Sequence, residues 1–593
     1  MRILILEDSK ASRILLEARL NKAGHITQAA ANGRQGFLLA TSQQYDAIIS
    51  DLNMPGWDGF KFIEAMKVVC PRIPIIVISS SFDESDVKER LLSYEMVIGV
   101  FGKPFDFDKL NELLGELKSQ SNSSVSKMAR IVATIGPASN SKEILGKMIL
   151  AGMDVTRLNF SHGSHEDHAK TLTNIRAAEE EWGKPIAVLQ DLCGPKIRTG
   201  QMEKNGILLT SGNTVTIQAD DITGTSSRFS TIAPEILEDL QVGDPILLDD
   251  GLLELKVTKE GIREVQCKIV VGGILKSSKG INLPVTKLSL PSVTEKDKRD
   301  LAWGLDHSVD YVALSFVRSA AEIIDIKNII AASGKRDIRV IAKIEKPEAV
   351  EHIIDIIEAA DAIMIARGDM GIELPAARVP RIQQEIINLC WQHNTPVITA
   401  TQMLDSMTVN AIPTRAEVTD VSVAIQEGTD AVMLSGETAA GNNPVNVVRT
   451  MASIITEEEQ YQFKDPFEDI KDDSTNISPA ISAAANLPGV ALTMLLDARG
   501  TLYKHLSKYS RNKPNILVTR SLHVARHSSL YKNMVPIIIR DDISRDEVVF
   551  KAITIAKEWG YLQTGDIFAV VEGERLTQGG VPQAGAFQLI TVS

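Results

Sequence analysis

The sequence predicts an α/β protein built from a small parallel α/β domain, a (β/α)8 barrel with an inserted β-rich domain, and a C-terminal α/β domain. A chain of 593 residues, 44% of them hydrophobic and 23% charged, has the composition of a globular protein and is too long for a single core. Short apolar runs that end in polar residues alternate with stretches of helix length, which is the pattern of parallel sheets covered by helices.

The composition also indicates where in the cell the protein is expected and which classes of partner are unfavourable. No apolar run approaches the ~20 residues that span a membrane, and the N-terminal stretch MRILILEDSK lacks the charged, apolar and cleavable regions of a signal peptide. The four cysteines lie far apart and have no metal-binding spacing. A net charge of −13 argues against non-specific binding to nucleic acid. We therefore expect a cytoplasmic protein with neither a nucleic-acid partner nor a membrane partner.

The first α/β pattern occupies residues 1–118. Its apolar runs are RILILE, AIISD, PIIVIS and VIGVFGK, and amphipathic stretches such as ASRILLEARLNKAG separate them. The polar, serine-rich stretch SQSNSSVS, residues 119–126, has neither helical nor strand periodicity and is the predicted linker.

Charged and polar side chains follow several of these runs, namely Glu7, Asp8, Asp51, Ser79 and Lys103. Because the ends of parallel strands meet at one edge of a sheet, we expect these side chains to lie close together. Three carboxylates would hold magnesium, and a lysine could pair with an added phosphoryl group. Each residue taken alone is as easily a solvated loop charge, but the joint pattern favours a site.

On these residues, the segment 1–118 resembles the receiver domain of bacterial response regulators, which has a flavodoxin-like fold. The resemblance implies that Asp51 is the phosphoacceptor and that a histidine kinase or a small phosphodonor supplies the phosphoryl group. It assigns Mg²⁺ and switch contacts to Glu7, Asp8, Asn53, Ser79 and Lys103. Val100 stands where the family commonly has a switch aromatic, so we expect the structural readout to be altered.

A second and larger pattern begins after the linker, with eight apolar runs, most of them separated by segments of helix length. The runs are ARIVATIG, DVTRLNFS, PIAVLQD, YVALSFV, IRVIAKIE, AIMIARGD, PVITATQ and AVMLSGE. Eight β-α repeats predict a closed barrel whose chemistry lies at the carboxyl ends of its strands. We assign the barrel to residues 127–198 and 285–460, an all-β insertion to residues 199–284, and the C-terminal α/β domain to residues 470–593.

Polar side chains follow nearly every one of these runs and would share one rim of the barrel. They are Arg157, Asn159, Ser161 and His162; Asp191, Lys196 and Arg198; Lys343 and Glu345; Arg367, Gly368 and Asp369; Thr401; and Ser435 and Glu437. Glu345 and Asp369 suit a hard divalent ion, Mg²⁺ or Mn²⁺, and the cations suit a phosphate-bearing substrate. A rim salt bridge would explain Lys343 with Glu345, and an ordinary loop histidine would explain His162, but neither explains the whole set.

The motifs from residue 127 to about residue 460 closely resemble those of the pyruvate kinase family. They appear in the family's order as TIGPAS, RLNFSHG, KGINLP, KIE, ARGDMGIELP, TATQML, TRAEVTD and LSGETAAG. The resemblance implies a β-barrel lid domain inserted after the third strand and a homotetrameric assembly. It also implies the glycolytic transfer of a phosphoryl group from phosphoenolpyruvate to ADP, which gives pyruvate and ATP.

Matching positions carry the family's site residues onto this chain. The divalent ion would bind Glu345 and Asp369, and Lys343 would neutralise the transferring phosphoryl group. The resemblance assigns substrate binding to Arg157, Gly368, Asp369 and Thr401, the proton path to Thr401, Ser435 and Glu437, and nucleotide binding to Thr134, Pro137, Asn159, His162 and Lys279. Asp250 matches a lid residue that faces the site when the lid closes.

The stretch DLCGPKIR, residues 191–198, departs from the commonest pattern of the family. Many members bind K⁺ at the positions of Asn159, Ser161, Asp191 and the carbonyl of Leu192, and have a glutamate where this chain has Lys196. The potassium-independent branch has a lysine there. We expect the Lys196 ammonium to replace the monovalent ion, so that potassium is not required. The other interpretation is an exposed lysine beside an intact ion site.

The C-terminal domain resembles the family more loosely. The stretch LLDARGT stands where regulated members have a phosphate-binding loop rich in Thr, Ser and Gly, and Asp497 brings a carboxylate there. We therefore expect no sugar-phosphate activation through this loop, and control by phosphorylation of Asp51 instead. A second interpretation is a receiver-linked signalling or scaffold protein that uses a weakly active pyruvate kinase fold as a metabolite sensor. A third is another phosphotransferase that uses phosphoenolpyruvate.

Overall fold

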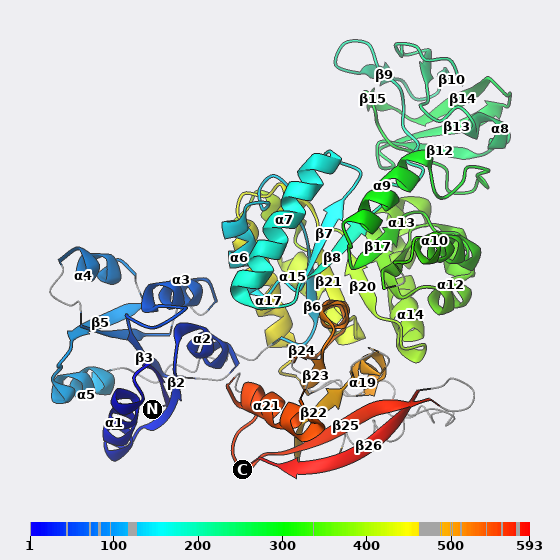
Figure 1. The fold of residues 1–593 in the computed structure, drawn as a ribbon. Helices are drawn as coiled ribbons and strands as arrows, with labels where there is room; N and C mark the ends of the chain where they lie inside the picture. The colour runs from blue at the N-terminus through cyan, green and yellow to red at the C-terminus, as the bar shows by residue number, and fades with distance from the viewer. Residues whose placement is uncertain are drawn as a thin grey trace.

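A computed structural model describes residues 2–592 of the chain, except 43–44, 70–72, 81–84, 95, 117–126, 336, 462–486, 488, 498–499, 501, 510–512, 541–542, 559–560 and 577–581. The predicted linker, 119–126, and the predicted start of the C-terminal domain lie outside the described residues. Figure 1 shows a central barrel with the N-terminal domain at its left, a β-rich lobe above it and the C-terminal domain below it. The predicted fold class is confirmed.

The N-terminal domain is a five-stranded parallel sheet in the order β2-β1-β3-β4-β5. Its strands are β1 (Arg2–Leu6), β2 (Ile26–Ala30), β3 (Ala47–Asp51), β4 (Ile75–Ser79) and β5 (Val97–Gly102). Its helices are α1 (Lys10–Lys22), α2 (Gly33–Ser42), α3 (Gly59–Val69), α4 (Ser85–Leu92) and α5 (Phe107–Glu116). The central strands β3 and β4 are buried along their whole length, which explains why they read as continuous apolar runs.

All eight predicted barrel strands are present, and they close in the order β17-β18-β19-β20-β21-β6-β7-β8. They are β6 (Arg130–Thr134), β7 (Val155–Asn159), β8 (Ala187–Asp191), β17 (Tyr311–Leu314), β18 (Arg339–Ile344), β19 (Ala362–Ala366), β20 (Val397–Ala400) and β21 (Ala431–Leu434). Most side chains on both faces of these strands are buried, inside the barrel or under its helices, so the strands are largely apolar. Exceptions include Arg130 and Arg339 at the amino ends of β6 and β18, and Arg157 in the middle of β7.

Helices cover the outside of the barrel, and capping side chains fix several of their starting points. Ser164 and Asp167 form a reciprocal capping box at the beginning of α7, which ends at Gly183 in the left-handed region. The α-helices are α6 (Lys142–Ala151), α7 (His165–Trp182), α9 (Glu295–Asp306), α10 (Ala320–Ala332), α11 (Pro347–Glu351), α12 (Ile353–Ala359), α13 (Arg367–Glu373), α14 (Val379–Gln392), α15 (Arg415–Glu427), α16 (Gly436–Ala439) and α17 (Pro444–Glu458), with 3₁₀ turns η1 (Ala376–Arg378) and η2 (Asp405–Thr408).

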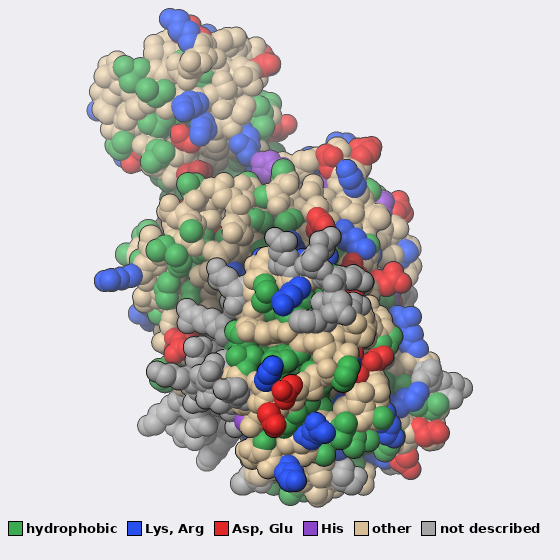
Figure 2. Space-filling model, turned by 90° about the vertical axis from the view of Figure 1, so that its left-hand side faces the viewer, with side chains coloured by type: hydrophobic (Ala, Val, Ile, Leu, Met, Phe, Trp, Pro, Cys, Tyr) green, Lys and Arg blue, Asp and Glu red, His purple; other side chains and the backbone are tan. Residues whose placement is uncertain are grey.

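The insertion between β8 and β17 forms a separate lobe, called the lid below, with its own apolar core. It contains β9 (Ile207–Leu209), β10 (Thr214–Gln218), β11 (Arg228–Ser230), α8 (Ile236–Asp239), β12 (Pro245–Leu248), β13 (Leu253–Lys259), β14 (Glu264–Val271), β15 (Gly273–Leu275) and β16 (Ile281–Asn282). The strands form one six-stranded and one two-stranded sheet. Figure 2 shows the lid projecting from the body through a narrower neck.

The C-terminal domain is a five-stranded sheet in the order β24-β23-β22-β25-β26, with only β26 antiparallel to its neighbour. It contains β22 (Val490–Leu496), α19 (Tyr503–Tyr509), β23 (Asn515–Thr519), α20 (Leu522–Ser528), β24 (Met534–Ile538), α21 (Arg545–Glu558), β25 (Ile567–Leu576) and β26 (Pro582–Thr591). It is fixed to the barrel by polar contacts, such as the bond that the Tyr311 hydroxyl donates to the carbonyl of His527 at 2.8 Å.

Among the described helices, none has both the length and the apolar character needed to cross a membrane.

Candidate active site

Asp191, at the carboxyl end of β8, is buried between two cations. Arg157 on β7 donates to Oδ2 of Asp191 from Nε at 2.7 Å, and its Nη2 lies 2.6 Å from the same oxygen. The ammonium of Lys343 lies 3.4 Å from Oδ1. Burial opposes ionisation of Asp191, yet Lys343 and Arg157 hold the pKa of this carboxyl below its ordinary value. A carboxylate therefore orients both cations at the rim.

Lys343, on β18, is surrounded by acceptors. Its Nζ lies 3.0 Å from Oε1 of Glu345 and donates to the Ser315 hydroxyl at 2.8 Å. Ser315 in turn donates to the carbonyl of Leu192 at 2.7 Å. Burial lowers the pKa of an ammonium, but Asp191 and Glu345 overcome that effect and raise the pKa of Lys343. Lys343 is thus a fixed, fully charged cation.

Glu345 has no exposed surface and keeps one oxygen without a hydrogen bond. The backbone N–H of Phe316 donates to Oε2 at 2.7 Å, from a residue held at φ 55°. Oε1 is within ion-pair distance of Lys343 but accepts no hydrogen bond. Burial raises the pKa of Glu345, against the opposing charge of Lys343. A buried carboxylate oxygen with no hydrogen bond is costly by itself, and together with the carboxylate of Asp369 it fits a divalent ion.

Thr401 follows β20 in a conformation that is rare for a β-branched residue, with φ 70°. Its hydroxyl accepts the backbone N–H of Gly368 at 2.8 Å and donates to the carbonyl of Ala400 at 2.6 Å. A side chain at Gly368 would lie 3.4 Å from that hydroxyl, so glycine leaves the approach open. Arg367 donates to the carbonyl of Thr401 at 2.8 Å and thereby supports the strained turn.

Ser435 and Glu437 follow β21, and the Glu437 carboxylate joins two loops. Glu437 is buried, and its carboxylate accepts the backbone N–H groups of Ser435 at 2.6 Å and Leu404 at 3.2 Å. Burial raises the pKa of Glu437. Its oxygens therefore meet the backbone after β20 and β21, and neither Ser435 nor Glu437 is among the residues that line the cavities described next.

The strand ends enclose a small polar cavity of about 70 Å³ at the mouth of the barrel. Its walls bring together predicted site residues from five strands and the loops that follow them, namely Arg157, Asn159, Ser161, Asp191, Lys196, Lys343, Asp369 and Thr401. A second cavity of about 220 Å³ lies between the barrel and the lid. Lys196 and Asp369 line both cavities, so they mark the boundary between them.

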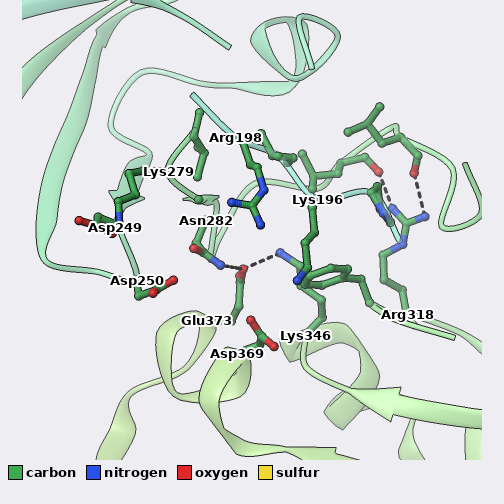
Figure 3. A pocket seen from close by; sticks show the side chains of 17 residues that line it. Lys196, Arg198, Asp249, Asp250, Lys279, Asn282, Arg318, Lys346, Asp369 and Glu373 are labelled. Carbon is green, nitrogen blue, oxygen red and sulfur yellow. Dashed lines mark hydrogen bonds and ion pairs between the residues drawn. The ribbon is translucent and has the colours of Figure 1, made fainter. Parts of the chain in front are cut away.

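Figure 3 shows the larger cavity, into which side chains of the lid and the barrel project from opposite sides. In the lid, the ammonium of Lys279 lies 2.7 Å from Oδ1 of Asp249, and Asp250 lines the same cavity. Asn282 of the lid donates to Glu373 of α13 at 2.9 Å. Lys279 is therefore paired within the lid rather than with the barrel.

The other predicted nucleotide positions lie along neighbouring loops. The Thr134 hydroxyl accepts from Nη1 of Arg157 at 2.8 Å. The side chain of Asn159 accepts the backbone N–H of Ser161 at 3.1 Å, while Pro137 and His162 are exposed. Burial and the nearby charge of Lys196 lower the pKa of His162.

Sequence reasoning missed Ser315 and Phe316, which follow β17 and hold Lys343 and Glu345 in place. Both residues occur in the apolar run YVALSFV, where neither carries a charge. The serine hydroxyl at the end of that run was the available signal. Phe316 contributes through its backbone N–H, which every residue except proline has, so the sequence could not identify it.

The receiver pattern also forms a compact acidic cluster. Glu7, Asp8 and Asp51 each offer a carboxylate oxygen, and these atoms lie within 4.8 Å of one another. The ammonium of Lys103 lies 2.5 Å from Asp51 and 2.8 Å from Glu7. Burial alone would lower the pKa of Lys103, but these two acids raise it. Converging carboxylates beside a lysine are the donor set that Mg²⁺ and an added phosphoryl group require.

The backbone N–H of Asn53 donates to Oδ1 of Asp51 at 3.1 Å. Ser79 is buried at the end of β4, and its carbonyl accepts the N–H of Lys103 at 2.9 Å. The structure therefore brings all of the predicted receiver residues to one edge of the sheet.

Comparisons with known proteins identify the family to which each of the three domains is similar. The family description "Pyruvate kinase, barrel domain" matches residues 126–448, "Pyruvate kinase, alpha/beta domain" matches residues 475–582, and "Response regulator receiver domain" matches residues 3–115. Relatives named pyruvate kinase from Staphylococcus haemolyticus (strain JCSC1435) and Staphylococcus aureus (strain USA300) are each 42% identical over 456 residues, which is 75% of this chain and 78% of theirs. The chain therefore belongs to the pyruvate kinase family and carries a response-regulator receiver domain at its N-terminus.

Proposed function

We propose that the chain transfers the phosphoryl group of phosphoenolpyruvate to ADP, giving pyruvate and ATP in glycolysis. The observation that carries this proposal is the polar cavity at the barrel mouth, where cations and carboxylates from four strands and their loops converge. Bringing two polyanions together requires positive charges that are already oriented, because a fixed charge needs no rearrangement as the reaction proceeds. Asp191 and its two cations meet that need.

In this reaction the bond between the enol oxygen and phosphorus breaks, and a β-phosphate oxygen of ADP forms the new bond to phosphorus. Arg157 and Lys343 hold the transferring group in line and oppose its charge. A divalent ion bound by Glu345 and Asp369 would neutralise further charge on the substrate oxygens. The enolate that is released takes up a proton at its methylene carbon, and Thr401, with its hydroxyl at the cavity wall, is the residue that we assign beside that carbon.

Ser435 and Glu437 are assigned to the same proton path, with a positioning contribution from Glu437. Its bonds to the backbone of Ser435 and Leu404 couple the β21 loop to the loop that carries Thr401. Nucleotide binding is assigned to Thr134, Pro137, Asn159, His162 and Lys279. For Lys279 to reach the nucleotide, its ion pair with Asp249 must open as the lid closes.

A coupled assay for pyruvate formation tests the function directly. We expect turnover that requires phosphoenolpyruvate, ADP and Mg²⁺ or Mn²⁺, with ATP as the second product. A folded protein without turnover would favour the alternative, a receiver-linked signalling or scaffold protein that uses the fold as a metabolite sensor. A phosphorylated product other than ATP would indicate a different phosphotransferase.

Potassium independence is part of the proposal. Lys196 lines the small cavity together with Asn159, Ser161 and Asp191, the positions that would otherwise hold the monovalent ion. Its ammonium would supply one positive charge there without a bound ion. Equal turnover in potassium and tetramethylammonium buffers is the expected result.

Control by the receiver is also proposed. A histidine kinase or a small phosphodonor would phosphorylate Asp51, and the two receiver states would contact the catalytic part differently. Beryllofluoride, which mimics the acyl phosphate, tests this proposal: the kinetics should change on its addition to the Mg²⁺-loaded protein.

A homotetramer is the expected assembly, which sedimentation analysis can check.

A further inference from the structure

The receiver contacts the barrel through the loop that follows its phosphoacceptor. Trp57 lies in the loop between β3 and α3, and its ring meets the ring of Trp182 edge to face, with centroids 4.3 Å apart. Trp182 is the last residue of α7. Trp57 is nearly fully buried, and its ring also contacts that of Phe37 on α2, with centroids 5.7 Å apart. Trp182 is only partly buried, but an aromatic pair packed between two domains still makes a specific contact, since edge-to-face rings have a preferred geometry.

An ion pair lies beside the two indoles. The ammonium of Lys61, on α3, lies 2.7 Å from Oε1 of Glu181, on α7, and 5.4 Å from the centroid of each ring. The other oxygen of Glu181 lies 3.1 Å from Lys142, the first residue of α6. The bond from Lys61 is the main reason that the pKa of Glu181 is lowered. Glu181 therefore joins the receiver to two barrel helices.

Two arginines flank this contact. Arg449 on α17 donates from Nε to the carbonyl of Val68 near the end of α3. The guanidinium of Arg34 on α2 lies so close to Gly183 that a side chain there would clash with it. Burial lowers the pKa of both arginines. The receiver is thus attached along α2, α3 and the loop that precedes α3.

The same loop is closed tightly on Asp51. The N–H of Gly59 donates to the carbonyl of Leu52 at 2.8 Å, and a side chain at Gly59 would lie 2.6 Å from the carbonyl of Asp51. The N–H of Gly33 donates to the carbonyl of Trp57 at 3.1 Å. The loop between Asp51 and Trp57 is therefore tightly packed, so a structural change at the Asp51 carboxylate should displace Trp57 at the contact with the barrel.

On the barrel side, the contacted helices lead to the predicted nucleotide loops. Lys142 begins α6 directly after the loop that contains Pro137. At its opposite end, α7 begins after the loop that contains His162, whose carbonyl lies 2.9 Å from Nε2 of His168. Asn174 of α7 donates to the carbonyl of Asn140, so the two helices and their loops are tied to each other.

Val100 lies on β5, which packs against α4. Figure 1 shows α4 and α5 on the side of the receiver away from the barrel, and Figure 2 views the molecule from that side. Val100 on β5 has no aromatic ring to swing between two positions. The loop after Asp51, which contacts the barrel, could transmit a change at Asp51 without a switch aromatic.

We infer that the state of Asp51 reaches the barrel through the contact of Trp57 and Lys61 with Trp182 and Glu181, and that it acts on ADP binding. This inference rests on the proposed control by the receiver and specifies its route. A change in the loop after Asp51 would alter the restraint on α6 and α7 and so reposition the loops of Pro137 and His162. The enol-phosphate end of the cavity, most of whose residues belong to β18, β19 and β20 or the loops after them, would be affected less.

The test uses the full chain with Mg²⁺, with and without beryllofluoride, and measures KM for ADP, KM for phosphoenolpyruvate and kcat. In the natural protein we expect KM for ADP to change about 5-fold or more, the lower end of typical allosteric coupling. Lys61→Met and Trp57→Ala should reduce that change to about 2-fold or less while leaving kcat without beryllofluoride intact. Lys61→Met removes the charge but keeps the packing of the stem, so it stays informative should Trp57→Ala fail to fold.

Lys109→Met, which replaces an exposed lysine on α5, is the matched control and should respond as the natural protein does.

Tryptophan fluorescence gives a second readout: beryllofluoride should change the fluorescence, and Trp182→Phe should remove most of that change. If KM for ADP changed in Lys61→Met and Trp57→Ala as much as in the natural protein, the inferred contact would be refuted, but control by the receiver would stand. A response confined to KM for phosphoenolpyruvate would contradict the inference that the receiver acts on ADP binding. No kinetic response in the natural protein, with the fluorescence change present, would refute receiver control and this inference together.

Discussion

The ammonium of Lys343 lies 3.0 Å from Oε1 of Glu345, and both side chains are buried. This pair concentrates opposite charges at the point where a transferring phosphoryl group would meet its divalent ion. An arrangement of this kind is maintained only because neighbouring donors and acceptors hold each member, here Ser315 on the lysine and the N–H of Phe316 on the glutamate.

Replacing Lys343 with methionine should lower kcat by about 10²-fold or more, because a cation fixed toward the reacting group is lost. Circular dichroism and the thermal midpoint should establish that the variant is folded, since Asp191 and Glu345 lose their shared partner. Lys298→Met, which removes an exposed cation from α9, is the matched control and should leave kcat unchanged. Comparable turnover of the two variants would contradict the assignment of Lys343.

Replacing Lys196 with glutamate should create a potassium requirement. The variant removes the ammonium from the rim of the cavity and puts a carboxylate beside Asn159, Ser161 and Asp191, which together would attract a monovalent cation. We expect turnover in tetramethylammonium buffer to fall about 10-fold or more and to recover largely in potassium buffer. Lys196→Met serves as the control, with low turnover in both buffers. Strong activation of the unmodified protein by potassium would refute the proposal.

The barrel could be predicted strand by strand because its strands are buried on both faces and are therefore largely apolar runs that end in polar residues. The same pattern identified Arg157, Asp191, Lys343 and Asp369, since a charge within a buried apolar strand or shortly after it stands out. Ser315 was missed because an uncharged side chain inside such a run carries little signal.

Contacts between domains were beyond sequence reasoning. Trp57 and Trp182 lie 125 positions apart in the chain, and no periodicity connects a receiver loop with the end of a barrel helix. Glu437 shows another limit: family resemblance placed it on the proton path, but only the structure reveals that its oxygens meet the backbone of two loops.

The C-terminal loop that begins at Asp497 should not respond to a sugar bisphosphate. The buried carboxylate accepts the N–H groups of Gly500 at 2.8 Å, Leu502 at 2.7 Å and Tyr503 at 3.2 Å, which are donors that an anionic ligand would need. Neighbouring positions 498, 499 and 501 lie outside the described residues. Steady-state rates with and without the sugar bisphosphate should coincide.

Asp497→Ser should free these donors, and inorganic phosphate should then raise the thermal midpoint of the variant but not that of the natural protein. Asp566→Ser, a carboxylate elsewhere in the same domain, is a suitable control. Clear activation of the natural protein by the sugar bisphosphate would contradict the prediction.

His527 should make the junction between barrel and C-terminal domain sensitive to acid. Burial lowers the pKa of this imidazole to about 4, and its Nε2 lies 3.2 Å from the carbonyl of Asp310. Because this value lies below that of an unfolded histidine, the unfolded chain binds more protons between the two values. The stability contribution of neutral His527 is therefore complete above pH ~6.5 and is lost as the pH falls toward 4, by about 3 kcal/mol in all. We expect the thermal midpoint of the natural protein to fall more steeply between pH 7 and about 4.5 than that of His527→Gln, which cannot titrate there. All other acid-titrating groups are common to both proteins, so parallel curves would show that His527 is protonated without penalty in the folded state.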